Sequence, residues 1–162
     1  MDCASWWLDH VGETYVYVLA TRAGDPGMQA TSIDRLLNGA RDWGSLIDVP
    51  QASGLMNDHV LIMKHLADSA FGHDQEGADR AIDGLILNMD RQGDLYQRQV
   101  PNFPTDEWRK LFETHLQATG GYILALSAGD IPDFKAKYGQ ALTNRNHLAR
   151  LWGRTAFQIG RS

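Results

Sequence analysis

The fold of this chain is decided by three similar stretches, DHVGETYVYVLATRAGD (9–25), DHVLIMKHLADSAFGHD (58–74) and THLQATGGYILALSAGD (114–130). In each stretch a histidine is followed 15 residues later by an aspartate. The three histidines, His10, His59 and His115, are separated by 49 and then by 56 residues. This period is typical of repeated pairs of helices. The pattern therefore predicts an internal repeat that is built from helical pairs.

Other helical segments follow each of these stretches, at about Thr31–Ile47, Glu76–Arg91 and Pro132–Gln158. The pairs Gly-Asp or His-Asp at the end of each stretch suit tight turns, because glycine ends helices and aspartate caps the next one. Ser53 and Thr105 are expected to cap the helices that open the second and third pairs. We therefore predict an all-α fold, a bundle of about six helices built as three αα-hairpin repeats, in one domain spanning residues 1–162.

Composition excludes several classes of protein. The 162 residues are 43% hydrophobic and 22% charged, which is typical of a globular chain. The net charge is −5 and no basic stripe occurs, so we expect no nucleic-acid partner. The longest apolar run, Tyr15 to Ala20, is far shorter than the roughly 20 residues that cross a bilayer, so we expect no membrane partner. Acidic residues near the start exclude a secretory signal, and a single cysteine, Cys3, fits a reducing compartment. The predicted localisation is cytoplasmic.

The three repeated histidines share a position on their helices. Helical spacing places each of them at the centre of an apolar stripe, whereas His65 and His147 point elsewhere and His73 falls in a turn. In an up-and-down bundle the three equivalent helices run in the same direction, so the imidazoles converge at one height. Imidazole is a common ligand of zinc, nickel and iron. We therefore predict that His10, His59 and His115 bind a divalent metal ion.

Other side chains near the same level complete this hypothesis. Glu13 lies one turn after His10 and is a candidate fourth ligand or catalytic base. Four hydroxyl-bearing residues on the same stripes are candidate ligand-binding groups: Thr14, Tyr17, Thr119 and Tyr122. The chain contains neither the His-Glu-x-x-His motif of zincins nor the Glu-x-x-His motif of di-iron bundles. The predicted site therefore has three histidines and an open position, an arrangement found in catalytic zinc sites.

Arg145 is the one charged residue within the apolar stripe of the last helix. A buried guanidinium needs a compensating charge. Either a salt bridge within the chain, or an apolar stem whose charged end reaches the surface, explains its position. Alternatively Arg145 binds an anionic group of a ligand, because a planar guanidinium holds a carboxylate or phosphate at two points.

The opening Trp7-Leu-Asp-His10-Val-x-x-Thr14, followed by Arg35-Leu-Leu-Asn, resembles a group of short, uncharacterised bacterial helical-bundle proteins. Members typically begin with Trp-x-x-His-Val-x-x-Thr-Arg; Tyr15 stands here in place of the arginine. More distantly, a bundle with three inward histidines is similar to the DinB-like family, which binds a metal through three histidines. That resemblance implies a metal site at His10, His59 and His115, although the His-x-x-x-His pair of that family is missing here.

The sequence leaves three functional hypotheses open. The first is a metal-binding protein, which can be a metal-dependent enzyme acting on a small anionic or aromatic molecule. The second is a metal-free bundle that binds a small apolar or aromatic ligand, with the histidines as hydrogen-bonding groups. The third is a structural or dimerising bundle whose exposed stripe faces a partner, such as a second copy of the chain in a homodimer. Metal analysis separates the first hypothesis from the other two.

Overall fold

Six α-helices make up the secondary structure of the part of the chain that is described. A computed structural model describes residues 2–159, with side chains as far as Thr155. The helices are α1 (Cys3–Ala23), α2 (Pro26–Leu46), α3 (Ala52–Phe71), α4 (Gln75–Gln99), α5 (Thr105–Ser127) and α6 (Ile131–Ile159). The prediction of an all-α bundle of six helices is confirmed.

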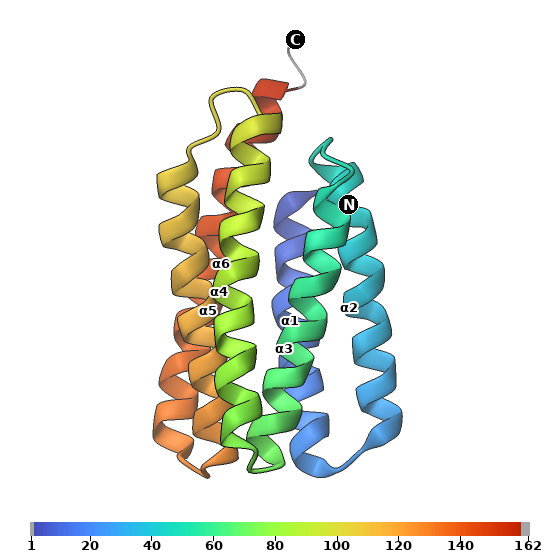
Figure 1. The fold of residues 1–162 in the computed structure, drawn as a ribbon, viewed down its shortest axis with the longest axis vertical. Helices are drawn as coiled ribbons and strands as arrows, with labels where there is room; N and C mark the ends of the chain where they lie inside the picture. Colours follow the sequence, from blue (N-terminus) through green and yellow to red (C-terminus); the bar gives the residue numbers. More distant parts are fainter. Residues whose placement is uncertain (1, 160–162) are drawn as a thin grey trace.

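The helices run alternately up and down (Figure 1). The turns that follow α1, α3 and α5 lie at one end of the bundle, and the connections after α2 and α4 lie at the other. The backbones of α1, α3 and α5 lie close to one another, whereas those of α2, α4 and α6 lie close only to their neighbours in the chain and, for α6, also to α1. The helices α1, α3 and α5 therefore form the inside of the bundle, run in the same direction, and are covered by the other three.

The three tight turns have the same backbone structure. Each joins a left-handed residue to a capping aspartate, in the pairs Gly24–Asp25, His73–Asp74 and Gly129–Asp130. The left-handed residues have φ angles of 65°, 58° and 78°. Each aspartate amide donates to the carbonyl five residues earlier, and each aspartate carboxylate accepts from the amide three residues later. The predicted capping of these three helices is confirmed.

The prediction that Ser53 and Thr105 are side-chain caps is wrong, because neither α3 nor α5 begins with a side-chain cap. Ser53 instead joins α3 to the end of α2. Its Oγ accepts from the Gly44 amide at 3.2 Å and donates to the Arg41 carbonyl at 2.8 Å. A Cβ atom at position 44 would lie 2.5 Å from this Oγ, so only glycine allows such a close approach.

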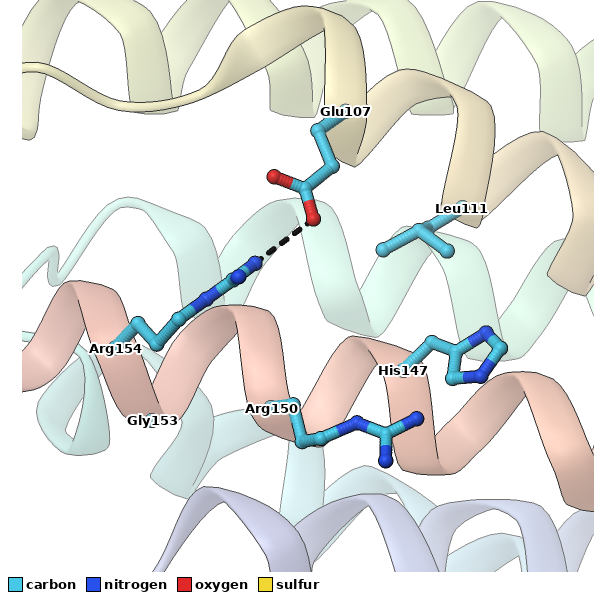
Figure 2. A pocket seen from close by; sticks show the side chains of 6 residues that line it. All are labelled: Glu107, Leu111, His147, Arg150, Gly153 and Arg154. Atoms are coloured by element: carbon cyan, nitrogen blue, oxygen red, sulfur yellow. Dashed lines mark hydrogen bonds and ion pairs between the residues drawn. The ribbon is translucent and has the colours of Figure 1, made fainter.

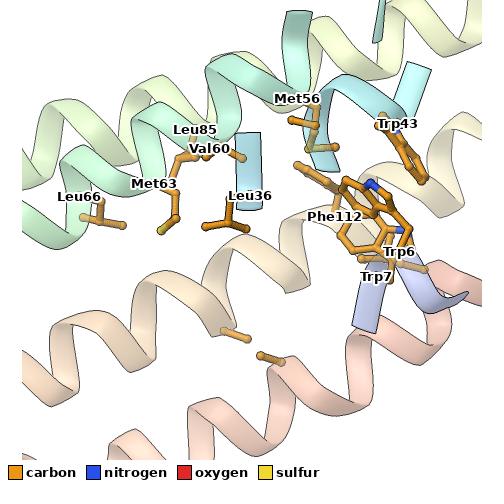
Figure 3. Packing of buried hydrophobic residues seen from close by; sticks show 14 of the residues in the cluster. Trp6, Trp7, Leu36, Trp43, Met56, Val60, Met63, Leu66, Leu85 and Phe112 are labelled. Carbon is orange, nitrogen blue, oxygen red and sulfur yellow. The ribbon is translucent and has the colours of Figure 1, made fainter. Parts of the chain in front are cut away.

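Aromatic side chains fill much of the core. All five tryptophans are buried: Trp6, Trp7, Trp43, Trp108 and Trp152. Trp6, Trp7 and Trp43 lie near Phe112 in the core (Figure 3). Met63 and Leu66 lie further along α3 (Figure 3). Each buried aromatic side chain removes roughly 150–250 Å² from water. Burial of these side chains therefore holds α1 and α2 against α5 and α6.

Some large apolar side chains lie on the surface, and two of them, Ile86 and Leu124, line one pocket. At least one is exposed on every helix: Leu8, Leu19, Met28, Leu61, Ile86, Leu87, Leu124 and Ile131. Single exposed apolar residues are common on proteins. Across the described residues, no helix has the combined length and apolar character that spanning a bilayer requires.

Candidate metal centre

The three repeated histidines meet in the core between α1, α3 and α5. One ring nitrogen from each of His10, His59 and His115 lies within 4.8 Å of the corresponding nitrogens of the other two. The ring centroids are 5.6, 5.8 and 5.9 Å apart. The three histidines lie at a similar height in the bundle, because their helices run in the same direction and each helix has its histidine in its first half. We call these three residues the histidine triad.

The histidine triad is almost completely buried. The exposed fractions of His10, His59 and His115 are 6%, 2% and 2%. Burial lowers the pKa of His59 to about 3 and that of His115 to about 4, because a charged imidazole loses its hydration. The pKa of His10 is also well below its usual value, through burial and then through repulsion by the other two rings. All three imidazoles are therefore neutral at physiological pH, which is the form that binds metals.

No hydrogen bond from another described residue reaches the side chains of the triad. His59 Nδ1 and both ring nitrogens of His115 are buried without a partner. Leaving a buried polar atom unpaired costs about 1–3 kcal/mol. A core histidine that served only the fold would be expected to bond a carbonyl or hydroxyl. The triad therefore lacks the partners that would make it an ordinary polar part of the core.

The donor set and its spacing fit a transition-metal ion. Imidazole nitrogens bind zinc at about 2.0–2.1 Å, which places them roughly 3–3.5 Å from one another in tetrahedral geometry. Nitrogens that lie within 4.8 Å need to move inward by less than about 1 Å each to reach that spacing. Three neutral nitrogens suit zinc, nickel or iron. Ion binding would also provide partners for nitrogens that have none.

Aromatic rings enclose one side of the triad. Trp6 stacks on His10, with ring centroids 4.9 Å apart and planes 9° apart. Trp7 presents its edge to His10 and His115, each at 5.6 Å. Phe112 lies 5.4 Å from His59 and 5.5 Å from His115. These rings restrict the rotation of the imidazoles and exclude water from that side, which strengthens any electrostatic interaction at the triad.

Glu13 lies in a pocket of about 280 Å³ between α1 and α2, which also has His10 on its wall. Its Oε1 accepts from Arg35 Nη1 at 2.9 Å. Its Oε2 is buried without a partner. The structure thus brings Glu13 and His10 to one pocket, but Glu13 is not among the residues whose ligand atoms converge within 4.8 Å. Glu13 therefore shares a pocket with His10 without belonging to the group of converging ligand atoms.

The four predicted hydroxyl groups are buried but differ in their partners. Thr14 Oγ1 donates to the carbonyl of His10 at 2.8 Å, and Tyr17 donates to Asp68 at 2.7 Å. Thr119 is 6% exposed. The hydroxyl of Tyr122 is buried without a partner, and burial raises its pKa above the usual range. The hydroxyls of Thr14 and Tyr17 are therefore already engaged within the fold.

Arg145 lies apart from the pocket at His10. It is half-buried on α6, and no ion pair joins it to another residue within the described part of the chain. Burial raises the pKa of Tyr138, and the positive charge of Arg145 partly opposes that rise. The pocket at His10 contains a different arginine, Arg35.

The other histidines lie outside the triad, as predicted: His65, His73 and His147 are all exposed. His147 lines an open surface groove of about 680 Å³ between α5 and α6 (Figure 2). There Arg154 pairs with Glu107 at 2.8 Å, and the side chains of Arg150 and His147 lie beside them. This larger hollow is on the outside of the bundle, away from the converging histidines.

Sequence reasoning missed a second buried polar cluster. Trp43 Nε1 donates to the Tyr96 hydroxyl at 3.0 Å, and that hydroxyl donates to Gln92 Oε1 at 2.9 Å. Gln92 Nε2 donates to Asn88 Oδ1 at 2.7 Å, and Asn88 Nδ2 donates to the Leu55 carbonyl at 2.9 Å. We call Trp43, Asn88, Gln92 and Tyr96 the amide network. The spacing of 88, 92 and 96, one helical turn each, was the available signal.

The role of Arg35 was also missed. Arg35 was noted only as part of the Arg35-Leu-Leu-Asn segment, and nothing in the sequence indicated that it pairs with Glu13 between α2 and α1. Comparisons of the chain with protein families, with curated proteins and with solved structures found no match.

Proposed function

We propose that this protein binds one divalent transition-metal ion, zinc, nickel or iron, through the histidine triad. The observation that carries the proposal is the convergence of three buried, neutral imidazoles, of which His59 and His115 have ring nitrogens without a partner among the described residues. The distant resemblance to the three-histidine DinB-like bundles points to the same residues. With three protein ligands the ion would retain a position for water or a substrate.

We further propose that the metal centre belongs to an enzyme acting on a small molecule. A bound ion would polarise a substrate or lower the pKa of a bound water. Glu13 fits the role of a base, because its Oε2 is buried without a partner and its Oε1 is held by Arg35. The pocket at His10 gives solvent access to the triad from one side.

Metal analysis of the freshly purified chain tests the proposal. We expect close to one ion per chain, and we expect His59→Leu or His115→Leu to abolish it, since leucine has a similar volume but no donor atom. His65→Leu is a matched control, because His65 lies on the same helix as His59 but is exposed. A chain that binds no ion, or a His65→Leu variant that loses as much metal as His59→Leu, contradicts the proposal.

The three helical pairs are proposed to be copies of one ancestral hairpin. In support, three hydrogen bonds join residues that are 33 positions apart: Trp6 to Gly39, Asn88 to Leu55 and Asn144 to Leu111. Each bond joins the residue four before a triad histidine and the residue 29 after it; the earlier residue is the donor in the first pair and the later residue in the other two. The three turns also share one backbone structure. Duplication of a hairpin carrying one inward histidine would produce a threefold site in a single chain.

A metal-free ligand-binding bundle remains the second candidate, because the molecule has an apolar pocket. The pocket lies between α3, α4 and α5, has a volume of about 380 Å³, and is lined mainly by aliphatic side chains. Leu66, Leu85 and Leu116 are on its wall, and Gly120 and Gly121 leave it room. A chain that binds an aromatic probe here and contains no metal would favour this candidate.

A further inference from the structure

The pocket between α1 and α2 is where the histidine triad meets solvent. His10 is on its wall and is the most exposed of the three histidines, at 6% against 2% for His59 and for His115. The volume of about 280 Å³ is slightly below the roughly 300–1,000 Å³ of sites for drug-sized ligands. A molecule that reaches the triad through this pocket is therefore small.

Arg35 supplies the positive charge of this pocket. Its side chain is 64% exposed and has one ion-pair contact, to Glu13 Oε1. A guanidinium has five N–H donors, so most of its donors remain available to a ligand. The planar guanidinium can donate two parallel hydrogen bonds to the two oxygens of a carboxylate. Arg35, and not Arg145, is therefore the arginine placed to hold an anionic group near the triad.

The sign of the pocket's charge depends on the metal. Asp9, Glu13 and Arg35 together carry a formal charge of −1 (−1 −1 +1), which repels anions. A divalent ion at the triad changes the sum to +1. An anionic ligand is thus favoured only when the metal centre is loaded, because two sources of positive charge then act on it.

We propose that this pocket is the substrate entrance of the metal centre, and that Arg35 selects small molecules that carry a carboxylate. This inference rests on the proposed metal-binding function. The carboxylate lies on the Arg35 guanidinium, and the rest of the molecule extends past Glu13 toward His10. Glu13 Oε2, which has no partner among the described residues, accepts a hydrogen bond from a donor group of the substrate or from water at the inner end.

Calorimetric titration with acetate tests the inference, with acetamide as an uncharged probe of the same shape. We expect the metal-loaded protein to bind acetate more tightly than acetamide, and the metal-free protein to bind neither. Arg35→Met should weaken acetate binding by roughly tenfold or more, since a charge-assisted hydrogen bond is lost. Arg35→Lys keeps the positive charge but cannot donate two parallel hydrogen bonds to a carboxylate. Its acetate affinity should lie between those of the original chain and of Arg35→Met.

Arg80→Met is the matched control. Arg80 is also exposed and also has one glutamate partner, Glu76, but it lies on α4, which contributes nothing to this pocket. The acetate affinity of Arg80→Met should stay within about twofold of that of the original chain, because a surface ion pair far from the pocket contributes little. Metal content is measured first in every variant.

The outcomes separate this inference from the proposed function. A chain that binds no metal refutes both. A metal-loaded chain refutes the inference alone if Arg35→Met binds acetate as tightly as the original chain, or if acetamide binds as tightly as acetate. Loss of acetate affinity in Arg35→Met at unchanged metal content, with Arg80→Met unaffected, supports it.

Discussion

The amide network and the histidine triad are both buried polar clusters, but they differ in how their polar atoms are paired. In the amide network four side chains form an unbroken series of hydrogen bonds that ends on a backbone carbonyl. In the triad no such bond is present among the described residues, and three ring nitrogens are buried without a partner. Tyr96 and Gln92 are 0% exposed, so the degree of burial does not explain the difference.

The difference indicates which cluster serves the fold and which serves a ligand. A fully paired buried network stabilises one arrangement of the core, because every alternative leaves a polar atom unpaired. An unpaired cluster destabilises the metal-free fold, and such a cost is typical of functional sites. The pairing of the amide network fits a structural role, and the unpaired nitrogens of the triad are the observation on which the proposed metal site rests.

The largest expected effect is stabilisation by metal. Binding to the folded chain alone adds about 4 kcal/mol when the free ion is at 1,000 times its Kd. For a chain of this size that corresponds to a rise in Tm of roughly 8–16 °C. Calorimetry of the protein with zinc and with chelator measures this rise. The rise should vanish in His59→Leu and persist in Tyr96→Phe; equal rises in both variants would place the ion elsewhere.

The next effect is the loss of stability of the metal-free protein in mild acid. The pKa values of His59 and His115 are about 3 and about 4 in the fold, whereas an unfolded histidine titrates near 6.5. The unfolded chain therefore binds more protons below pH 6.5, so stability falls as the pH falls from 6.5 toward 4. Each histidine contributes about 1.5 kcal/mol of that loss between pH 6.5 and 5.

Urea unfolding at several pH values measures this slope. The double variant His59→Leu/His115→Leu removes two of the three triad imidazoles and should flatten the curve, while His147→Leu should not. A slope that is unchanged in the double variant would mean that the triad is protonated in the fold.

Much of the fold could be predicted because its signals are local. Asp25, Asp74 and Asp130 each follow a turn residue and precede a helix, so their capping role follows from the chain alone. The convergence of the three histidines follows from their shared spacing in the sequence, since similar positions on parallel inner helices lie at one height. Ser53 was predicted wrongly, because its partners Gly44 and Arg41 come from the preceding helix.

The pairing of polar side chains between helices could not be predicted. The contact of Arg35 with Glu13 depends on how α2 is rotated against α1, which no periodicity within either helix specifies. The bond between Trp43 and Tyr96 joins residues 53 positions apart. Likewise, helical spacing placed Tyr17 and Tyr122 on the same stripes as the histidines, but it did not indicate that Tyr17 bonds Asp68 while Tyr122 has no partner.

Substitutions that remove polar atoms should have opposite effects in the two clusters. Tyr96→Phe leaves Trp43 Nε1 and Gln92 Oε1 unpaired, so we expect a loss of about 1–3 kcal/mol. His115→Leu removes two unpaired nitrogens and retains the volume, so the metal-free protein should keep its stability or gain about 1 kcal/mol. Urea unfolding in the presence of chelator compares the two variants. A large loss in His115→Leu would show that the imidazole is paired in solution.

The smallest effect compares two asparagines at equivalent positions. Asn88 and Asn144 are each 3% exposed and donate to the Leu55 and Leu111 carbonyls at 2.9 and 3.0 Å. Asn88 also accepts from Gln92, whereas Asn144 Oδ1 has no partner. Asn88→Ala should therefore cost about 1 kcal/mol more than Asn144→Ala, because it alone leaves a second buried group unpaired. The cavities left by the two changes are similar in size, so their cost largely cancels in this difference. When Gln92→Leu is also present, the two asparagine variants should lose the same stability. If Asn88→Ala still costs more there, the extra loss comes from packing and not from the amide network.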